Sequence, residues 1–119
     1  AYFYPRMYNY KFKCIKYIIL LRSTLDMIKA SIIGASGYAG AELARLLMMH
    51  EDVEIIYLCS RSHANQKFNT LYPGHIAGDY TLSEIDFERI GNESDIIFTA
   101  LPHGVSSKTV VALSKYNKN

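Results

Sequence analysis

The stretch IKASIIGASGYAGAELARLLMMH, residues 28–50, decides the fold of this 119-residue chain. Its first part is apolar and ends at Ile33, which indicates a strand. Gly34, Gly37 and Gly40 then follow at three-residue intervals. Behind them the apolar residues recur at helical spacing. The face predicted to be shared and apolar consists of Ala39, Leu43, Leu46 and Leu47. Strand, glycine turn and helix in this order are typical of a dinucleotide-binding βα unit.

The glycine spacing is G-x-x-G-x-x-G, because Ser36 stands where the usual G-x-G-x-x-G has its middle glycine. Glycines let the backbone approach a pyrophosphate, and the helix N-terminus adds free N–H groups. The Ser36 hydroxyl can itself donate to a phosphate. The alternative is an ordinary tight turn in which Ser36 only caps the helix. The strand before the turn and the helix behind it favour nucleotide binding.

Composition limits the classes of function. With 50% hydrophobic and 20% charged residues, the chain can bury a core, and its length suits one domain. The net charge of +2 arises in residues 1–26, which carry five basic residues and one acid, whereas the remainder is slightly acidic. We therefore expect no nucleic-acid partner. We also expect no membrane span, because the longest apolar run of the basic segment, Tyr17–Leu21, is far too short.

Residues 1–26 are predicted to be an extension outside the domain, which would occupy residues 27–119. A mitochondrial-type presequence is the alternative, although the segment lacks an arginine-rich amphipathic face.

Cys14 and Cys59 lie far apart without metal-ligand spacing, and Cys59, at the end of an apolar run, is expected to be a buried, inert thiol. His63 and His75 also lack partners at ligand spacing, so no metal site is predicted. A reducing, cytoplasmic compartment fits these features.

The second strand, Val53–Cys59, completes a βαβ unit whose crossover should be right-handed. Its end is where such folds select between NAD and NADP, and a carboxylate there would bind the ribose hydroxyls of NAD. This chain has Ser60-Arg61-Ser62 instead. A planar guanidinium suits the 2′-phosphate of NADP. A solvated surface arginine is the alternative.

The remainder predicts a partial Rossmann-type, doubly wound parallel sheet. Residues 63–80 should be mostly loop with one helical turn near residues 66–71. Residues 85–90 suit a short strand or a helix, broken at residues 92–95. Residues 95–101 are almost all apolar and are predicted to be a central parallel strand, followed by a helix over 105–115. His103, in the turn between them, either contacts cofactor or substrate or is a capping or exposed histidine.

Four pieces of the chain together resemble N-acetyl-γ-glutamyl-phosphate reductase, the NADPH-dependent enzyme family of arginine biosynthesis. They are GASGYAGAELARLL at 34–47, HEDVEI at 50–55, SRS at 60–62 and ALPHGVS at 100–106. They occur in the family's order and spacing across residues 27–116. Aspartate-semialdehyde dehydrogenases share the fold and a similar glycine turn but are less similar in the later pieces.

The resemblance implies a phosphate turn, a 2′-phosphate site and a nicotinamide side. The phosphate turn would be formed by Gly34, Ser36, Gly37, Tyr38 and Gly40. Ser60 and Arg61 would hold the 2′-phosphate of NADP. The residues near the nicotinamide would be Leu101, Pro102 and His103.

The resemblance also implies a reaction, the reduction of a small-molecule acyl phosphate to an aldehyde by NADPH through a cysteine thioester, with a histidine as acid and base. That cysteine lies in a Gly-Cys-Tyr-type turn which this chain does not contain, so no catalytic residue is assigned. The chain is expected to be a fragment, and the full-length enzyme a homo-oligomer. A non-catalytic NADP-binding module and an inactive truncated product are the alternatives.

Overall fold

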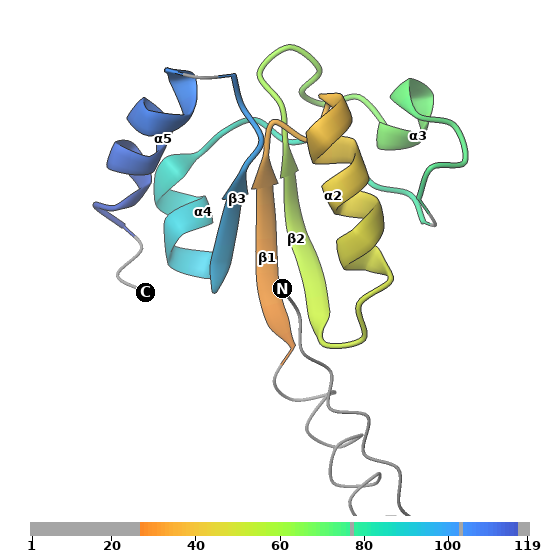
Figure 1. The fold of residues 1–119 in the computed structure, drawn as a ribbon, viewed down its shortest axis with the longest axis horizontal. Coiled ribbons are helices and arrows are strands. Elements are labelled where there is room, and N and C mark those ends of the chain that lie inside the picture. Colours follow the sequence, from red (N-terminus) through yellow and green to blue (C-terminus); the bar gives the residue numbers. More distant parts are fainter. Residues whose placement is uncertain (1–26, 77, 103, 117–119) are drawn as a thin grey trace, which may run out of the picture.

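The described part of the chain is a parallel sheet with helices on both faces (Figure 1). The computed structural model describes residues 27–76, 78–102 and 104–116. In chain order the elements are β1 (Ile28–Ile33), α2 (Tyr38–Met48), β2 (Val53–Cys59), α3 (Phe68–Leu71), α4 (Phe87–Glu93), β3 (Ile96–Thr99) and α5 (Val105–Leu113). The predicted partial Rossmann-type fold is confirmed. The prediction that residues 1–26 form an extension falls outside the described residues.

The sheet has the order β2-β1-β3, with all strands parallel, so β1 lies in the centre. Among the described strands β3 pairs with β1 alone and its Ile96 is 42% exposed, so the expectation that β3 is central in the whole sheet stays a prediction. The strand is shorter than predicted. After Ala100, whose N–H still donates to the Ile33 carbonyl at 2.8 Å, the chain leaves the sheet toward Pro102, which has no N–H to donate.

A β-bulge interrupts the pairing of β1 with β2. Ala30 pairs with Ile55 and Ser31 pairs with Tyr57, so Ile56 is skipped. Side chains alternate between the two faces of a regular strand, and one extra residue reverses that alternation. As a result Ile55 and Leu58 both join the core under α2, whereas Tyr57 and Cys59 join the core on the side of α4 and α5.

Helix α2 packs on the sheet through small residues. Gly40, Ala41 and Ala44 are buried, and Leu43, Leu47 and Met48 are half-buried against the same core. The predicted apolar face is therefore wrong at Ala39, which is exposed, and at Leu46, which is 53% exposed. The helix begins immediately at the glycine turn, where only small side chains fit between its backbone and the sheet. This close approach rotates the larger leucines toward the margins of the interface.

The two helical predictions in the middle of the chain are largely confirmed. Helix α3 lies inside the predicted turn at 66–71. Helix α4 begins at the Asp86 side chain, which caps it by accepting a hydrogen bond of 3.1 Å from the Arg89 N–H. The helix continues through Asn92, so the predicted break at that residue is wrong. It closes at Ser94, whose N–H donates to Ile90. In the described ranges no helix is long and apolar enough to cross a membrane.

Candidate dinucleotide-binding site

The turn after β1 lies between the carboxyl ends of the two neighbouring strands. The N–H groups of Gly34 and Ala35 donate to the Cys59 carbonyl at 2.9 and 3.0 Å, which ties the turn to the end of β2. On the other side the Ala100 N–H donates to Ile33, so β3 ends beside the same turn. Sheets of this type bind ligands where the connections diverge from a central strand. The turn stands at that point.

The three glycines of the turn are there for three different reasons. Gly34 has a φ of +90°, and a Cβ there would overlap the Ala100 carbonyl. A Cβ on Gly40 would overlap the backbone of Gly34 and Ala35, so this glycine allows α2 to pack against the turn. A Cβ on Gly37 would have only the Gly34 carbonyl nearby, at an ordinary contact distance of 3.6 Å. Two glycines therefore serve the fold, and Gly37 leaves open space.

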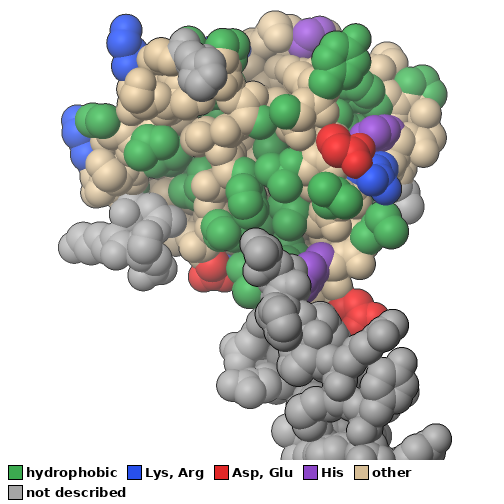
Figure 2. All heavy atoms as spheres, viewed as in Figure 1, with side chains coloured by type: hydrophobic (Ala, Val, Ile, Leu, Met, Phe, Trp, Pro, Cys, Tyr) green, Lys and Arg blue, Asp and Glu red, His purple; other side chains and the backbone are tan. Residues whose placement is uncertain are grey.

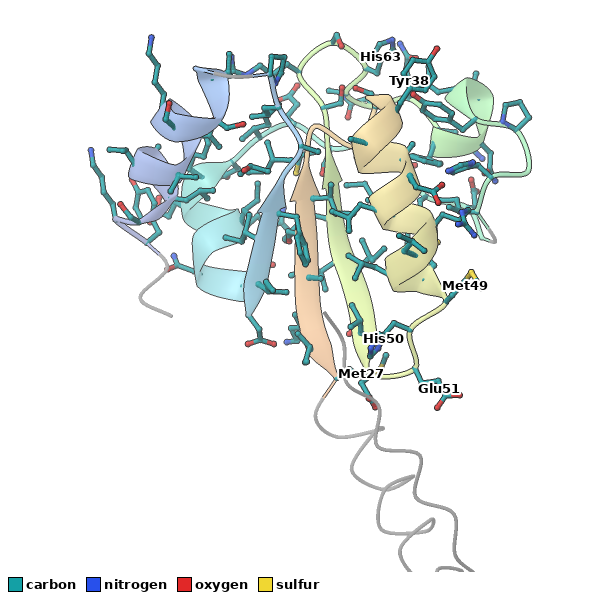
Figure 3. All side chains as sticks on the ribbon, viewed as in Figure 1. Met27, Tyr38, Met49, His50, Glu51 and His63 are labelled. Carbon is teal, nitrogen blue, oxygen red and sulfur yellow. The ribbon has the colours of Figure 1, made fainter. Side chains whose placement is uncertain are left out.

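The first turn of α2 is free to bind an anion. Gly37 is its N-cap, and in the described part of the chain no side chain caps it and no acid lies in its first turn. Tyr38, at the first helical position, is 88% exposed. Figure 3 shows Tyr38 and His63 at the end of the sheet where the strands finish, and Met27, His50 and Glu51 at the opposite end. The uncapped N–H groups and the helix dipole both favour a phosphate at this end.

The three residues after β2 differ sharply in exposure. Ser60 is only 2% exposed, whereas Arg61 and Ser62 are exposed. Of the ion pairs formed in residues 27–76, 78–102 and 104–116, none involves Arg61. A hollow of about 280 Å³ adjoins this segment. It is lined by Ser60, Arg61, Ala64, Glu84, Ile85 and Phe87. An unpaired guanidinium at the mouth of a partly apolar hollow suits an adenosine carrying a phosphate.

The predicted nicotinamide-side residues follow β3 at the same end of the sheet. Leu101 is half-buried, and its side chain approaches to 3.0 Å of the position a Cβ on Gly34 would occupy. Pro102 is exposed, and its carbonyl accepts from the Val105 N–H at 3.2 Å, which starts α5. His103 falls outside the described residues. The structure thus brings Leu101 to the glycine turn and leaves the role of His103 a prediction.

Tyr72, which the sequence did not predict as a site residue, contacts the main chain of the glycine turn. The Tyr72 hydroxyl donates to the Ser36 carbonyl at 2.7 Å. The Tyr72 ring lies 5.4 Å from the ring of fully buried Phe68 and 5.6 Å from that of His75, measured between centroids. Tyr72 comes 36 residues after Ser36, in a segment without hydrophobic period, so no sequence signal pointed to the contact.

Cys59 fits the prediction of an inert thiol. It is fully buried, and burial raises its pKa, although a hydrogen bond with the Ser83 hydroxyl, 3.6 Å from its sulfur, acts in the opposite direction. A protonated, buried thiol is a poor nucleophile. Within the described ranges, moreover, no cluster of three or more histidine, cysteine or acidic side chains exists that would hold a metal ion.

We predict that Cys59 reacts slowly with iodoacetamide in a Cys14→Ser background, where it is the sole thiol. At pH 8 alkylation should be about 100-fold slower than in the same protein unfolded in urea, because reaction requires opening of the core. Burial raises the pKa of the Cys59 thiol above its unfolded value of about 8.5, so the protonated thiol stabilises the fold below that pH. This stabilisation is lost as the pH rises through the pKa of the folded state. Free energies of unfolding measured from pH 7 to 10 should therefore fall. Equal alkylation rates in folded and unfolded protein would contradict burial.

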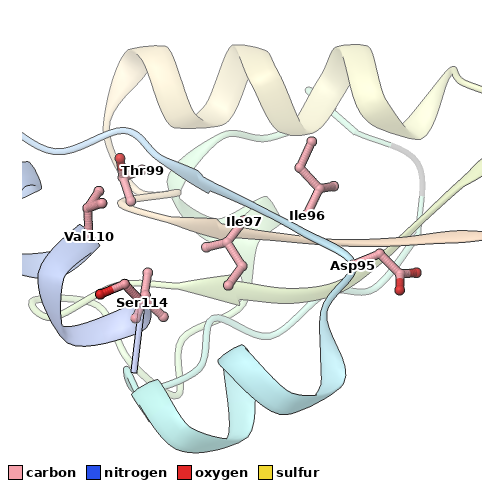
Figure 4. Close-up of a pocket in the computed structure, with 7 residues that line it drawn as sticks. Asp95, Ile96, Ile97, Thr99, Val110 and Ser114 are labelled. Carbon is pink, nitrogen blue, oxygen red and sulfur yellow. The ribbon is translucent and has the colours of Figure 1, made fainter. Parts of the chain in front are cut away.

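A second hollow lies away from the turn. It has about 310 Å³ and runs along the outer edge of β3 beside α5, lined mainly by Ile96, Ile97, Val110 and Leu113 (Figure 4). Figure 2 shows hydrophobic side chains gathered over the middle of the molecule, where α2 leaves the β1–β3 side of the sheet uncovered. Asp95 is the only ionisable side chain among the residues that line this hollow. The residues that line this hollow therefore include no cationic side chain that would pair with a nucleotide phosphate.

The chain matches the model of a known protein family. The model of the family "Semialdehyde dehydrogenase, NAD binding domain" matches residues 29–118. The chain belongs to this family. The description of the family specifies an NAD-binding domain, which agrees with the glycine turn, the uncapped helix and the parallel sheet described above. A nicotinamide nucleotide is therefore the cofactor class of the site.

Several curated relatives of the chain are named as reductases. The chain is 49% identical over 85 residues to an N-acetyl-gamma-glutamyl-phosphate reductase of Halothermothrix orenii, covering 71% of this chain and 24% of the relative. It is 42% identical over 88 residues to a putative LysW-L-2-aminoadipate/LysW-L-glutamate phosphate reductase of Cenarchaeum symbiosum, covering 72% and 25%. The chain thus spans about a quarter of the length of the curated relatives it matches.

A solved structure supports the same assignment. Aspartate semialdehyde dehydrogenase from Candida albicans, crystallised with NADP, matches with a TM-score of 0.59 and 25% identity. The match covers 72% of this chain and 26% of that one. The expected resemblance to N-acetyl-γ-glutamyl-phosphate reductases is therefore confirmed, and the related semialdehyde dehydrogenases share the fold.

Proposed function

We propose that this chain is the NADP-binding part of an N-acetyl-γ-glutamyl-phosphate reductase, which reduces an acyl phosphate to a semialdehyde. The observation that carries the proposal is the open glycine turn at the carboxyl ends of the strands, with an unpaired arginine at the end of β2. The relatives that share 45–49% of the aligned residues are named as this enzyme. A small-molecule acyl phosphate as substrate, a homo-oligomeric full-length enzyme and a cytoplasmic location belong to the same proposal.

The proposed cofactor lies across the end of the sheet. Its diphosphate occupies the space left by Gly37, where the N–H groups at the start of α2 donate to it. The 2′-phosphate is held by Arg61, whose two parallel N–H groups fit a pair of phosphate oxygens. Glu84 lines the same hollow as Arg61, so the cationic character of this site depends on a single guanidinium.

The nicotinamide supplies the hydride when the cofactor is bound, and the residues of this chain bind and orient it. Leu101 and Pro102 border the nicotinamide side of the proposed site, next to the turn at Gly34. Among the described residues the one thiol is Cys59, which is buried and has a raised pKa. We therefore assign no nucleophile for acyl transfer to this part of the enzyme.

A second candidate function is a non-catalytic NADP-binding module. The burial of Cys59 fits both candidates, because the reductase proposal also assigns no nucleophile to this part of the chain. Both candidates use the same cofactor site and therefore share the test that follows. They differ in what surrounds the nicotinamide rather than in how NADP is held.

Replacement of Arg61 tests the proposed cofactor. Arg61→Ala should weaken NADP⁺ by about 2 kcal/mol, the contribution of a charge-assisted hydrogen-bonded pair, and leave NAD⁺ almost unchanged. Titration calorimetry of the full chain with both nucleotides measures the difference. Glu84→Gln is the matched control, since it removes a charged side chain from the same hollow and should bind NADP⁺ at least as tightly as the original chain. Equal losses for both nucleotides in Arg61→Ala would contradict the 2′-phosphate role.

A further inference from the structure

The Ser60 hydroxyl contacts the glycine turn, although Ser60 also lines the hollow beside Arg61. Its oxygen lies 2.8 Å from the oxygen of the Ser36 hydroxyl, and the side chain is buried, with Ser60 only 2% exposed. Arg61, the next residue, is exposed. The Ser60 hydroxyl is therefore engaged by the turn and by the His63 N–H, whereas the Arg61 guanidinium is open to solvent, so the two adjacent residues offer a ligand different contacts.

The direction of the Ser36–Ser60 hydrogen bond follows from the neighbours of Ser60. The backbone N–H of His63 can only donate, and it donates to the Ser60 oxygen at 3.2 Å. The Ser60 hydroxyl must place its own hydrogen on an acceptor, because a buried hydroxyl without a partner costs free energy. The acceptor that the structure provides is the Ser36 hydroxyl oxygen. Ser36 then accepts from Ser60, and its own hydrogen is free to point elsewhere.

Ser36 is also fixed through its backbone. Tyr72 donates to its carbonyl at 2.7 Å, and the Tyr72 ring is held by the rings of Phe68 and His75. His75 is anchored in turn to α2, with its Nε2 atom 3.2 Å from the Ala41 carbonyl. Tyr72 thus holds the main chain of Ser36, and Ser60 contacts its hydroxyl. Both residues come from the segment after β2.

We propose that Ser60 is a positioning residue of the diphosphate site, which orients the Ser36 hydroxyl so that it donates its hydrogen to a phosphate oxygen of the bound dinucleotide. The hydrogen-bond chain runs from the His63 N–H through Ser60 to Ser36 and ends on the phosphate. This inference rests on the proposed function, because it requires a dinucleotide in the turn. It assigns Ser60 to the diphosphate, which NAD and NADP share, and leaves the 2′-phosphate to Arg61.

Three ligands distinguish this role from a direct contact with the 2′-phosphate. In the full chain, Ser60→Ala should weaken NADP⁺ and NAD⁺ by the same factor, about five- to tenfold, as expected for one lost hydrogen bond to a charged group. Adenosine 2′-monophosphate, which carries the 2′-phosphate but no diphosphate, should bind within twofold of the original affinity. Loss of NADP⁺ and adenosine 2′-monophosphate without loss of NAD⁺ would show that Ser60 binds the 2′-phosphate and would overturn the proposal.

A double-mutant cycle tests whether Ser60 acts through Ser36. In a Ser36→Ala background, Ser60→Ala should cause no further loss of either dinucleotide, whereas independent roles would give multiplied losses and overturn the proposal. Ser31→Ala is the matched control, because it breaks another buried hydrogen bond between two serine hydroxyls, those of Ser31 and Ser94, 2.6 Å apart. It should lower stability and leave all three affinities unchanged. A loss of affinity equal to that of Ser60→Ala would show a general effect of stability.

Ser60→Cys keeps the volume of the side chain and replaces the hydroxyl with a weak donor, so it serves if Ser60→Ala does not fold. The same equal loss of NADP⁺ and NAD⁺ affinity is expected, and an unchanged affinity would overturn the proposal.

Binding to the original chain distinguishes failure of this proposal from failure of the proposed function. If it binds none of the three ligands, the proposed function itself fails. If it binds them and only Ser60→Ala departs from the expected pattern, the cofactor site stands and the role of Ser60 is wrong.

Discussion

Gly34→Ala should lower the free energy of unfolding by about 3 kcal/mol, which for a domain of this size is a fall in Tm of about 15 °C. Two costs add at this position. A φ of +90° is unfavourable for any residue with a Cβ, by about 1–2 kcal/mol. The new Cβ would also overlap the Ala100 carbonyl, and overpacking against backbone costs about 1–3 kcal/mol. Thermal unfolding of the full chain, followed by circular dichroism, measures the effect.

Gly74→Ala separates these two costs. Gly74 also has a positive φ, +70°, but a Cβ there would meet no atom within 4 Å. It should therefore lose only the conformational part, about 1 kcal/mol. If Gly34→Ala and Gly74→Ala were equally destabilising, the close contact between the turn and the end of β3 would not exist in solution, and the arrangement of the site would be wrong.

Gly37→Ala should abolish most cofactor binding without affecting the fold. The φ and ψ of Gly37, −81° and 164°, are ordinary for alanine, and its Cβ would make only an ordinary contact of 3.6 Å with the Gly34 carbonyl, so stability should change by less than about 0.5 kcal/mol. A methyl group there would, however, hold the diphosphate away from the N–H groups at the start of α2. We expect an affinity loss of at least 30-fold for NADP⁺, about 2 kcal/mol.

The matched variant for binding is again Gly74→Ala, which lies outside the proposed site and should bind NADP⁺ with unchanged affinity. Calorimetric titrations and thermal melts of the two variants together give the required comparison. Unchanged NADP⁺ affinity in Gly37→Ala would mean that the diphosphate does not lie at this glycine. A large loss of stability would mean that the space beside Gly37 is filled in solution.

The elements with a strong local pattern were predictable from sequence. The strand up to Ile33, the strand Val53–Cys59 and the helix behind the glycines lie where periodicity and the turn placed them. The packing faces were less predictable. Ala39 and Leu46 are exposed because the glycine turn brings α2 so close to the sheet that Ala41 and Ala44 fill the contact. The early end of β3 at Thr99 was not predictable from its composition, because the chain leaves the sheet where it turns toward Pro102.

The candidate site was predictable where it is local and not where it is formed by distant contacts. Gly34, Gly37 and Gly40 are recognisable by spacing, although only the structure separates the two that serve packing from the one that leaves room. Ser60 and Arg61 are adjacent in sequence but differ in exposure, since one points into the turn and the other to solvent. The Tyr72 contact joins residues too far apart for any local pattern.

The bulge at Ile56 makes β2 unequally sensitive to changes in length. Loss of Ile56 would restore regular pairing with β1 and leave Leu58 and Cys59 on their present faces, because Ile56 is the residue that the pairing skips. Insertion or loss of one residue between Tyr57 and Ser60, where the pairing is regular, would instead turn Ser60 away from Ser36. In homologous chains, changes in length should therefore be rare between Tyr57 and Ser60 and more frequent at Ile56. The loop around Gly74, where added atoms meet no neighbour, should accept them.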